Sequence, residues 1–355
     1  MAETIAAGFI GCGSHARRNV LPALQFSPVS LQATCDLEIE KAEECARQFG
    51  AARWYTSHLQ MLESESLDAV FIVTNYDEDG RPRYPALATD CMHAGCHAWI
   101  EKPPAASVAE IEGMQRVSEE TGKFVLVGFK KCFVPAVRRT REIMQREEFG
   151  ALTSLYVRYP QRMPSEEAKR AGGRKVRGFL DHVVHPGSIV QCLGGPVSTV
   201  IHQRCVHGDD DAGGGFALLR FASGAVGTMH FAAPQSATSP LERVEVIGQG
   251  ANIVIDNGVK LTYYRPGSRG PGGYGGATNY MGDDATAPIY WEPEFSLGQL
   301  YNKGLFLLGY AQSVRHFAQC VLANDRPTLC GLEDALQIMK LYEALLQPEG
   351  QVISL

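Results

Sequence analysis

The sequence lacks the features that define several classes of protein. It holds no apolar run of about 18 to 20 residues, the length that a membrane-spanning helix needs. Its formal net charge is −6, whereas binding to nucleic acid requires a clustered basic surface. The first residues lack the basic start, the apolar core and the cleavage site of a secretory signal. We therefore expect a cytoplasmic protein that has neither a membrane nor a nucleic acid as a partner.

The ten cysteines form no C-x-x-C pair anywhere in the chain. Most of them lie among apolar neighbours, where a free cysteine behaves as a small hydrophobic residue. Thiols in a reduced cytosolic protein stay unpaired, and structural zinc sites use closely spaced cysteine pairs. We therefore expect neither a disulfide framework nor a metal site.

Two patterns of apolar residues divide the chain of 355 residues, a length typical of two domains. In the first part, short apolar runs alternate with helical patterns, which predicts a parallel sheet covered by helices on both faces. These runs are 4–11, 30–36, 67–75, 96–102 and 124–129. After about residue 150 the apolar runs lengthen and are joined by the turn signals ASG, GQG and DNG, which predicts an antiparallel sheet. These runs are 153–161, 199–208, 215–233 and 241–264.

We therefore predict an α/β protein with a doubly wound parallel sheet in residues 1–128 and an α+β domain with a mainly antiparallel sheet in residues 129–355. Helical patterns close the chain at 309–325 and 332–347. The glycine-rich segment 266–279 is expected to form a mobile loop rather than a helix or strand.

The segment GFIGCGSHA, which follows the first predicted strand, has the form of a dinucleotide-binding fingerprint. Gly11 allows the tight turn, Gly13 lets the backbone approach a pyrophosphate, and Ala16 lets the next helix pack closely on the strand. Asp36 ends the second predicted strand about twenty residues later, where a carboxylate contacts the ribose hydroxyls of the adenosine. Because that carboxylate repels a 2′-phosphate and Leu37 rather than an arginine follows it, the pattern favours NAD over NADP and predicts a Rossmann domain.

Two further segments carry candidate chemistry. Lys102, in WIEKPPA, follows a strand of the parallel sheet, and ligands gather at the carboxyl ends of such strands. Asp181 and His185 are four residues apart, so on a helix they share one face and the carboxylate can orient the imidazole. Alcohol oxidation at a nicotinamide needs a proton acceptor, which lysine or histidine can provide. Alternatively, D-x-x-x-H is an ordinary contact on a helix surface and the lysine points into solvent.

The succession of GxGxxA, Asp36, EKP and D-x-x-x-H resembles the Gfo/Idh/MocA oxidoreductase family, whose members include glucose-fructose oxidoreductase and inositol dehydrogenase. The resemblance covers nearly the whole chain and implies a Rossmann domain followed by a substrate-binding and oligomerisation domain with a large open sheet. It implies that Lys102, Asp181 and His185 form the catalytic group. His185 would exchange the hydroxyl proton, Lys102 would hydrogen-bond the same oxygen and lower its pKa, and Asp181 would orient His185.

The resemblance also implies the residues that bind ligands. The cofactor would be held by Gly11, Cys12, Gly13, Ser14, His15, Asp36, Thr74, Asn75, Glu101, Lys102 and Lys130. The substrate would be held by Lys102, Lys130, Asp181, His185 and Ser188.

Three positions depart from the family pattern. The family's T-P-N and histidine are replaced by TNYDEDGRPRY, which lacks the proline, carries an insertion at 76–83 and has Tyr84 where we would place the histidine. We expect segment 76–83 to close over substrate, to contact a second subunit, or to be a solvated charged loop. Ser188 stands where the family often has an aspartate that contacts a polyol, which puts an inositol-type substrate in doubt. GFKKCF replaces a run that usually contains arginine, with Lys130 or Lys131 as the basic substitute.

The resemblance implies an NAD(P)-dependent oxidoreductase that transfers hydride between nicotinamide and a hydroxyl-bearing carbon of a sugar, a sugar derivative or a cyclitol. It also implies a homodimer or homotetramer. One alternative is an enzyme that keeps NAD bound and uses transient oxidation to cleave or epimerise a sugar without net redox change. A second alternative is a non-catalytic regulator that binds NAD.

Overall fold

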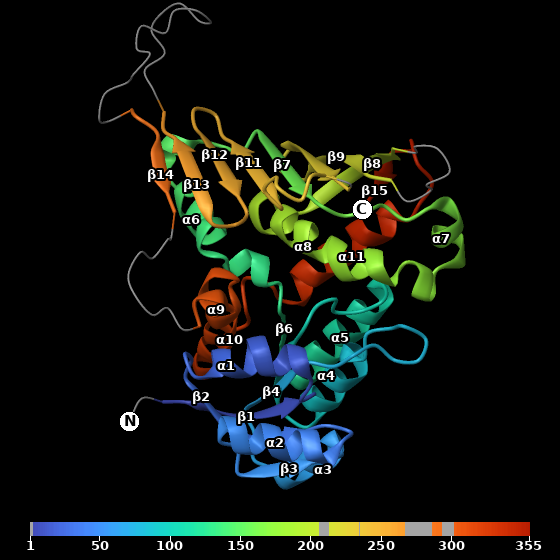
Figure 1. The fold of residues 1–355 in the computed structure, drawn as a ribbon, viewed down its shortest axis with the longest axis vertical. Coiled ribbons are helices and arrows are strands. Elements are labelled where there is room, and N and C mark those ends of the chain that lie inside the picture. Colours follow the sequence, from blue (N-terminus) through green and yellow to red (C-terminus); the bar gives the residue numbers. More distant parts are fainter. Residues whose placement is uncertain (1–2, 206–212, 234, 267–285, 293–301) are drawn as a thin grey trace, which may run out of the picture. The chain divides into compact units, whose positions relative to one another are not determined.

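The computed structural model describes residues 3–205, 213–233, 235–266, 286–292 and 302–355, which form two compact units by their internal contacts (Figure 1). The first unit combines residues 1–133, 166–188 and 302–347. The second unit combines residues 134–165, 189–301 and 348–355. Both units are therefore built from separate stretches of chain, and a single boundary after residue 128 stays a prediction.

The first unit contains a six-stranded parallel sheet in the order β3-β2-β1-β4-β5-β6. Its strands are β1 (Ile5–Ile10), β2 (Val29–Cys35), β3 (Arg53–Tyr55), β4 (Ala69–Ile72), β5 (His97–Ile100) and β6 (Val125–Val127). All residues of β4, β5 and β6 are buried, as expected for strands covered on both faces. The order reverses between β1 and β4, which confirms the doubly wound fold and leaves a crevice at the carboxyl ends of these two strands.

Two helices of the first unit have caps that the sequence supplies. Gly50, in a left-handed conformation with φ 83°, ends α2, and its N–H bonds the Ala46 carbonyl. The Ser107 hydroxyl accepts from the Glu110 N–H at the start of α5. The helices are η1 (Ala16–Val20), α1 (Leu21–Leu24), α2 (Ile39–Phe49), α3 (His58–Ser64), α4 (Tyr84–His93), α5 (Val108–Thr121), η2 (Lys130–Phe133), α7 (Glu166–Ala171), η4 (Gly173–Lys175), α9 (Lys303–Leu307), α10 (Tyr310–Ala323) and α11 (Leu332–Leu345). Helix α8 (Arg177–Gly194) carries Asp181 and His185.

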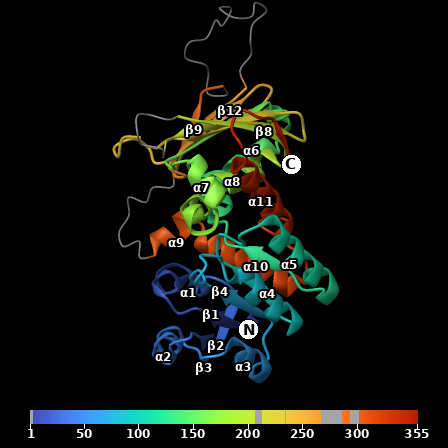
Figure 2. The ribbon, with the colours of Figure 1, turned by 90° about the vertical axis from the view of Figure 1, so that its right-hand side faces the viewer.

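The aromatic core of the first unit joins residues that are far apart in the sequence. Phe317 of α10 makes edge contacts with Phe71 of β4 and with Phe124, at ring-centroid distances of 5.3 and 6.0 Å. The indole N–H of Trp99 in β5 donates to the Ser313 hydroxyl at 3.2 Å. Helix α10 thus completes the core of a sheet whose strands all lie before residue 128, and Figure 2 shows α4 and α5, which pack together, beside that sheet.

The second unit contains a nine-stranded sheet in the order β14-β13-β12-β11-β7-β10-β9-β8-β15. Its strands are β7 (Ser154–Tyr159), β8 (Val197–Arg204), β9 (Gly215–Phe221), β10 (Val226–Phe231), β11 (Arg243–Ile247), β12 (Asn252–Asp256), β13 (Lys260–Tyr264), β14 (Ile289–Trp291) and β15 (Ile353–Ser354), with α6 (Pro135–Met144) and η3 (Glu147–Phe149) among its helices. Neighbouring strands are antiparallel except β7 and β10, which pair in parallel, so the predicted mainly antiparallel sheet is confirmed. The long connection between these two strands, which includes α8, permits the parallel pair. From residue 267 on, the glycine-rich segment lies outside the described residues.

Other expectations concern what the chain contains. Among the described residues, no helix is long and apolar enough to cross a membrane. Within the same segments, no group of three or more His, Cys, Asp or Glu side chains is arranged to hold a metal ion. All ten cysteines lie in described segments, where none of them forms a disulfide, and most of them are buried.

Candidate active site

The loop after β1 uses its two fingerprint glycines for different reasons. Gly11 has φ +94°, and a Cβ at this position would lie 2.0 Å from the Val73 carbonyl oxygen, so only glycine fits. A Cβ at Gly13 would meet no atom within 4 Å, because this position faces open space. That space leaves the backbone of the loop accessible to a pyrophosphate group.

Asp36 holds the same loop from the end of β2. Its Oδ2 accepts a hydrogen bond from the Cys12 N–H at 2.7 Å, and its Oδ1 accepts one from the Glu38 N–H at 3.1 Å. The carboxylate therefore lies beside the glycine loop, where the sequence predicts it. It also lines a cavity of about 480 Å³ together with Gly11, Gly13 and Leu37.

A second cavity, of about 920 Å³, adjoins the first, and we call it the cleft. Both cavities are lined by residues of the first unit, and the linings share Gly13, Lys41, Val73, Thr74, Asn75 and Tyr76. Volumes of about 300 to 1,000 Å³ are typical of sites for small ligands and cofactors. The open position at Gly13 and the carboxylate of Asp36 fit a dinucleotide that extends across both cavities.

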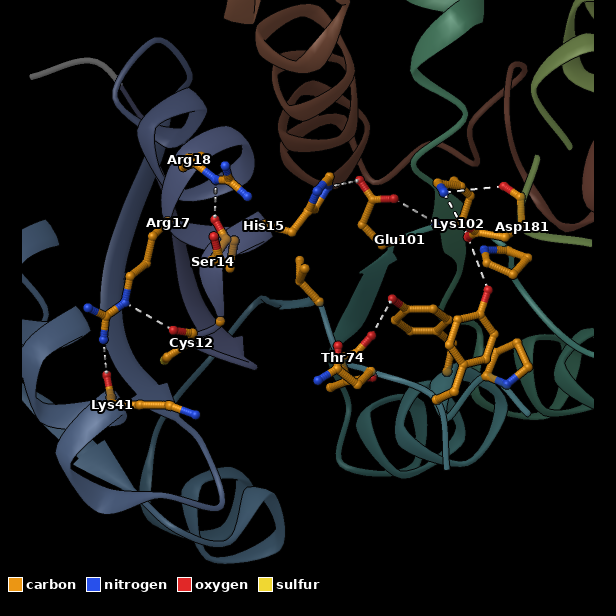
Figure 3. Close-up of a pocket in the computed structure, with 18 of the residues that line it drawn as sticks. Cys12, Ser14, His15, Arg17, Arg18, Lys41, Thr74, Glu101, Lys102 and Asp181 are labelled. Carbon is orange, nitrogen blue, oxygen red and sulfur yellow. Dashed lines mark hydrogen bonds and ion pairs between the residues drawn. The ribbon is translucent and has the colours of Figure 1, made fainter. Parts of the chain in front are cut away.

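Lys102 and Asp181 form an ion pair on the wall of the cleft (Figure 3). Lys102 follows β5, and its ammonium Nζ donates to Asp181 Oδ1 at 2.9 Å and to the Asp181 carbonyl oxygen at 3.3 Å. Burial opposes ionisation of Asp181, but the charge of Lys102 and hydrogen bonds from Lys102 and Tyr76 outweigh it, so the pKa of Asp181 lies below its usual value. Asp181 is therefore an ionised carboxylate paired with a cation.

His185 lies one helical turn beyond Asp181 and is 8% exposed. Burial, followed by the charges of Lys102, Lys131 and Lys130, lowers its pKa well below the ordinary value of 6.5. The imidazole is therefore neutral at neutral pH and can accept a proton. Asp181 bonds Lys102 and Tyr76, and its predicted role in orienting His185 stays a prediction.

Three predicted substrate residues, His185, Ser188 and Lys130, are not among the described residues that line the cleft, and the contact of His185 with a substrate stays a prediction. Ser188 is 1% exposed, and its hydroxyl donates to the His185 carbonyl at 2.8 Å, inside helix α8. Lys130 Nζ donates to the Tyr310 hydroxyl at 3.1 Å and lies 4.6 Å from the centroid of that ring. Contacts of Ser188 and Lys130 with a substrate stay predictions.

Glu101 supports Lys102 from the preceding position. Its Oε2 accepts from the Lys102 backbone N–H at 2.9 Å, and its Oε1 lies 3.2 Å from His15 Nε2. The Tyr310 hydroxyl lies 3.4 Å from the same histidine nitrogen. Two of the cofactor residues predicted by resemblance, His15 and Glu101, are therefore in contact, and they link the start of the fingerprint helix to Lys102. Both line the cleft, together with Cys12 and Ser14 (Figure 3).

Segment 74–84 contains a residue of the site, Tyr76, that the sequence analysis did not identify as a candidate. Thr74 and Asn75 line both cavities, and their contact with the cofactor stays a prediction. Tyr84, at the expected histidine position, is buried and donates to the Thr74 carbonyl at 3.0 Å. The missed residue is Tyr76, whose hydroxyl donates to Asp181 Oδ1 at 3.0 Å. The one signal in the sequence was the departure from the family pattern at this segment.

Comparisons with known proteins identify the family and the fold of this chain. The profile of the oxidoreductase family with an NAD-binding Rossmann fold matches residues 5–129, and that of the GFO/IDH/MocA C-terminal domain matches residues 137–254. The chain is 29% identical over 229 residues to the scyllo-inositol 2-dehydrogenase (NAD(+)) of Bacillus subtilis, which covers 61% of this chain and 63% of that protein.

Two further comparisons extend over nearly the whole chain. The chain is 22% identical over 346 residues to the myo-inositol 2-dehydrogenase of Thermotoga maritima, covering 95% of this chain and 94% of that protein. The structure of levoglucosan dehydrogenase in complex with NADH and levoglucosan superposes with a TM-score of 0.76 at 16% identity, covering 99% of both chains. At that identity the superposition shows a shared fold.

Proposed function

The chain belongs to the Gfo/Idh/MocA oxidoreductase family, and from this membership we propose that it is an NAD-dependent dehydrogenase of a hydroxyl group on a sugar or cyclitol. The observation that carries the proposal is the Lys102–Asp181 ion pair, because it lies on the wall of the same cleft as the glycine loop. The names of the inositol and levoglucosan dehydrogenases support the substrate class.

Each residue of the site has a separate task in this proposal. NAD, when bound, supplies the hydride acceptor. The ammonium of Lys102 has three N–H donors, two of which point to Asp181, and the third would bind the substrate hydroxyl oxygen and stabilise negative charge there. The neutral ring of His185 would accept the hydroxyl proton at a ring nitrogen, and Asp181 would hold the ammonium of Lys102 in place through their ion pair.

We propose NAD rather than NADP because Asp36 faces the smaller cavity at the end of β2. The carboxylate would accept hydrogen bonds from the ribose hydroxyls and would repel a 2′-phosphate. Titration of the protein with NADH and NADPH, followed by nucleotide fluorescence, measures this preference directly. Equal affinity for the two nucleotides would contradict it.

The test of the whole proposal is a panel of cyclitols, aldoses, anhydrosugars and sugar derivatives, incubated with NAD and followed by NADH absorbance at 340 nm. Lys102→Met removes the ammonium but keeps an unbranched side chain, and we expect a loss of about 10²- to 10⁴-fold in kcat, the usual size for a group that assists proton transfer. The matched control is Lys260→Met, at an exposed position of β13. The Lys260→Met control should keep the wild-type kcat and NADH affinity.

Two outcomes would overturn the proposal. Activity of Lys102→Met within twofold of wild type would remove the lysine from the chemistry. A product detected by mass spectrometry without net NADH would replace the dehydrogenase by a redox-neutral enzyme.

A further inference from the structure

Tyr76 is joined to the Lys102–Asp181 pair, although the family pattern gave no reason to expect a tyrosine there. We propose that Tyr76 is a positioning residue whose hydroxyl holds the Asp181 carboxylate ionised and directed at Lys102. The inference rests on the proposed function, because it assigns a role within the same site. It goes further by making segment 76–83 part of the catalytic apparatus of this chain.

The hydrogen-bond geometry is specific. The Tyr76 hydroxyl lies 3.0 Å from Asp181 Oδ1, and Lys102 Nζ lies 2.9 Å from the same oxygen. Burial, the charge of Asp181 and this hydrogen bond together raise the pKa of Tyr76. The phenol therefore keeps its proton, and because an ionised carboxylate only accepts, Tyr76 is the donor.

The segment that carries Tyr76 is a tight hairpin. Tyr76 and Pro82 form an antiparallel bridge, and Asp77 Oδ1 accepts from the N–H groups of Asp79 and Arg81 at 3.0 and 2.7 Å. Gly80, with φ +81°, makes the turn. The segment thus has an ordered backbone that fixes where the tyrosine side chain starts.

Arg174 and Arg177, which precede Asp181 in the sequence, contact this hairpin. The guanidinium carbon of Arg177, in the first turn of α8, lies 5.3 Å from the centroid of the Tyr76 ring. A Cβ at Gly80 would lie 2.9 Å from Arg174 Cγ, so the hairpin packs closely on η4. The tyrosine ring is therefore held by the helix that carries Asp181, and its hydroxyl is placed to keep the carboxylate in one orientation.

The charge balance at Asp181 shows what the hydroxyl contributes. Burial alone would raise the pKa of this carboxyl, and the charge of Lys102 and the two hydrogen bonds offset that rise. Removal of the Tyr76 donor leaves burial less opposed, so the pKa of Asp181 rises. Once protonated, Asp181 no longer provides a counter-charge to Lys102, and the ion pair that directs the ammonium is lost.

The test is Tyr76→Phe, which removes the hydroxyl and keeps the ring that contacts Arg177. We expect kcat/KM to fall roughly 10-fold to 100-fold, the effect of one lost hydrogen bond to a charged group, with the loss in kcat and not in NADH affinity. We also expect the acid limb of the kcat/KM profile to move to higher pH. A ring that only filled space would leave that limb where it is in wild type.

Tyr55→Phe is the matched control, because the Tyr55 hydroxyl also donates to a carboxylate, that of Glu65, which forms an ion pair with Arg53. Tyr55 is not part of the lining of either cavity in the described structure. We expect this variant to keep the wild-type pH profile, and its thermal midpoint shows what loss of such a hydroxyl does to stability alone.

A second measurement separates this inference from the proposed function. The pKa of Asp181 is followed by carbon-13 NMR of its labelled carboxyl group in wild type and Tyr76→Phe, without substrate. A higher pKa in the variant supports the inference even if no sugar or cyclitol yields NADH, in which case the proposed function alone fails. An unchanged Asp181 pKa, or a drop in activity with an unshifted acid limb, overturns the inference.

Discussion

The Lys102–Asp181 pair makes a prediction that can be worked out from its burial. Asp181→Asn keeps the shape and the oxygen acceptor at this position but removes the charge that faces Lys102. The two side chains are 17% and 32% exposed. Breaking a fully buried pair costs about 3–5 kcal/mol, and an exposed pair contributes about 0–1 kcal/mol, so we expect this variant to lose about 1–2 kcal/mol.

The pH dependence of that loss follows from the direction of the Asp181 pKa. The pKa is lowered in the folded protein from 3.8, so the pair stabilises the fold fully above that value and is lost only as the pH falls through the lower, folded value. The difference in stability between wild type and Asp181→Asn should therefore stay constant from about pH 5 to pH 8.

Differential scanning fluorimetry measures this difference as a decrease in Tm of about 2–8 °C, at about 2–4 °C for each kcal/mol. The control is Asp256→Asn, which breaks the more exposed pair with Arg243, 39% and 26% exposed, and should lower Tm by a smaller amount. A variant as stable as wild type, or a difference that shrinks between pH 8 and pH 5, would refute the reasoning.

Two further predictions concern the glycine loop and the histidine. Gly11→Ala should lower Tm sharply, because its Cβ would lie 2.0 Å from the Val73 carbonyl oxygen. Gly13→Ala, whose Cβ meets nothing within 4 Å, should keep the wild-type Tm and weaken NADH binding measured by fluorescence. Equal effects of the two substitutions would contradict the separate tasks of the two glycines. The pKa of His185 is lowered below 6.5, so the imidazole is neutral at pH 6.5 and above and becomes protonated only at lower pH. We therefore expect that protonation of His185 does not reduce kcat/KM for alcohol oxidation at pH 6.5. A fall in kcat/KM at pH 6.5 or above that wild type shows and His185→Ala lacks would contradict the role of neutral His185 as the proton acceptor.

The fold was largely predictable because alternating apolar runs and glycine signals act locally. The buried runs at β1, β4 and β5 were visible in the sequence as such. Strand β3 was not, because it has three residues, of which Arg53 and Trp54 are exposed, and so shows no apolar run. Strands β14 and β15 were not predicted either, because they have only three and two residues.

The site was predictable where spacing encodes it and not where the fold brings distant residues together. Gly11, Gly13 and Asp36 follow from a local motif and line one cavity, and their contacts with a cofactor stay predictions. Tyr76 is 105 residues from Asp181, and Lys130 is 180 residues from Tyr310, so neither contact has a local signature. The number of subunits stays a prediction.

The core contacts of α10 decide how the chain can be divided. Phe317 and Ser313 belong to the last fifth of the sequence, yet they fill the space against Phe71 and Trp99 in the nucleotide-binding sheet. A fragment that stops at residue 128 would expose these aromatic surfaces and would lack Asp181 as well. The two units therefore cannot be exchanged as single continuous segments. An exchange of the nucleotide-binding unit between relatives must include residues 166–188 and 302–347, because a single crossover point would separate its sheet from the helices that pack on it.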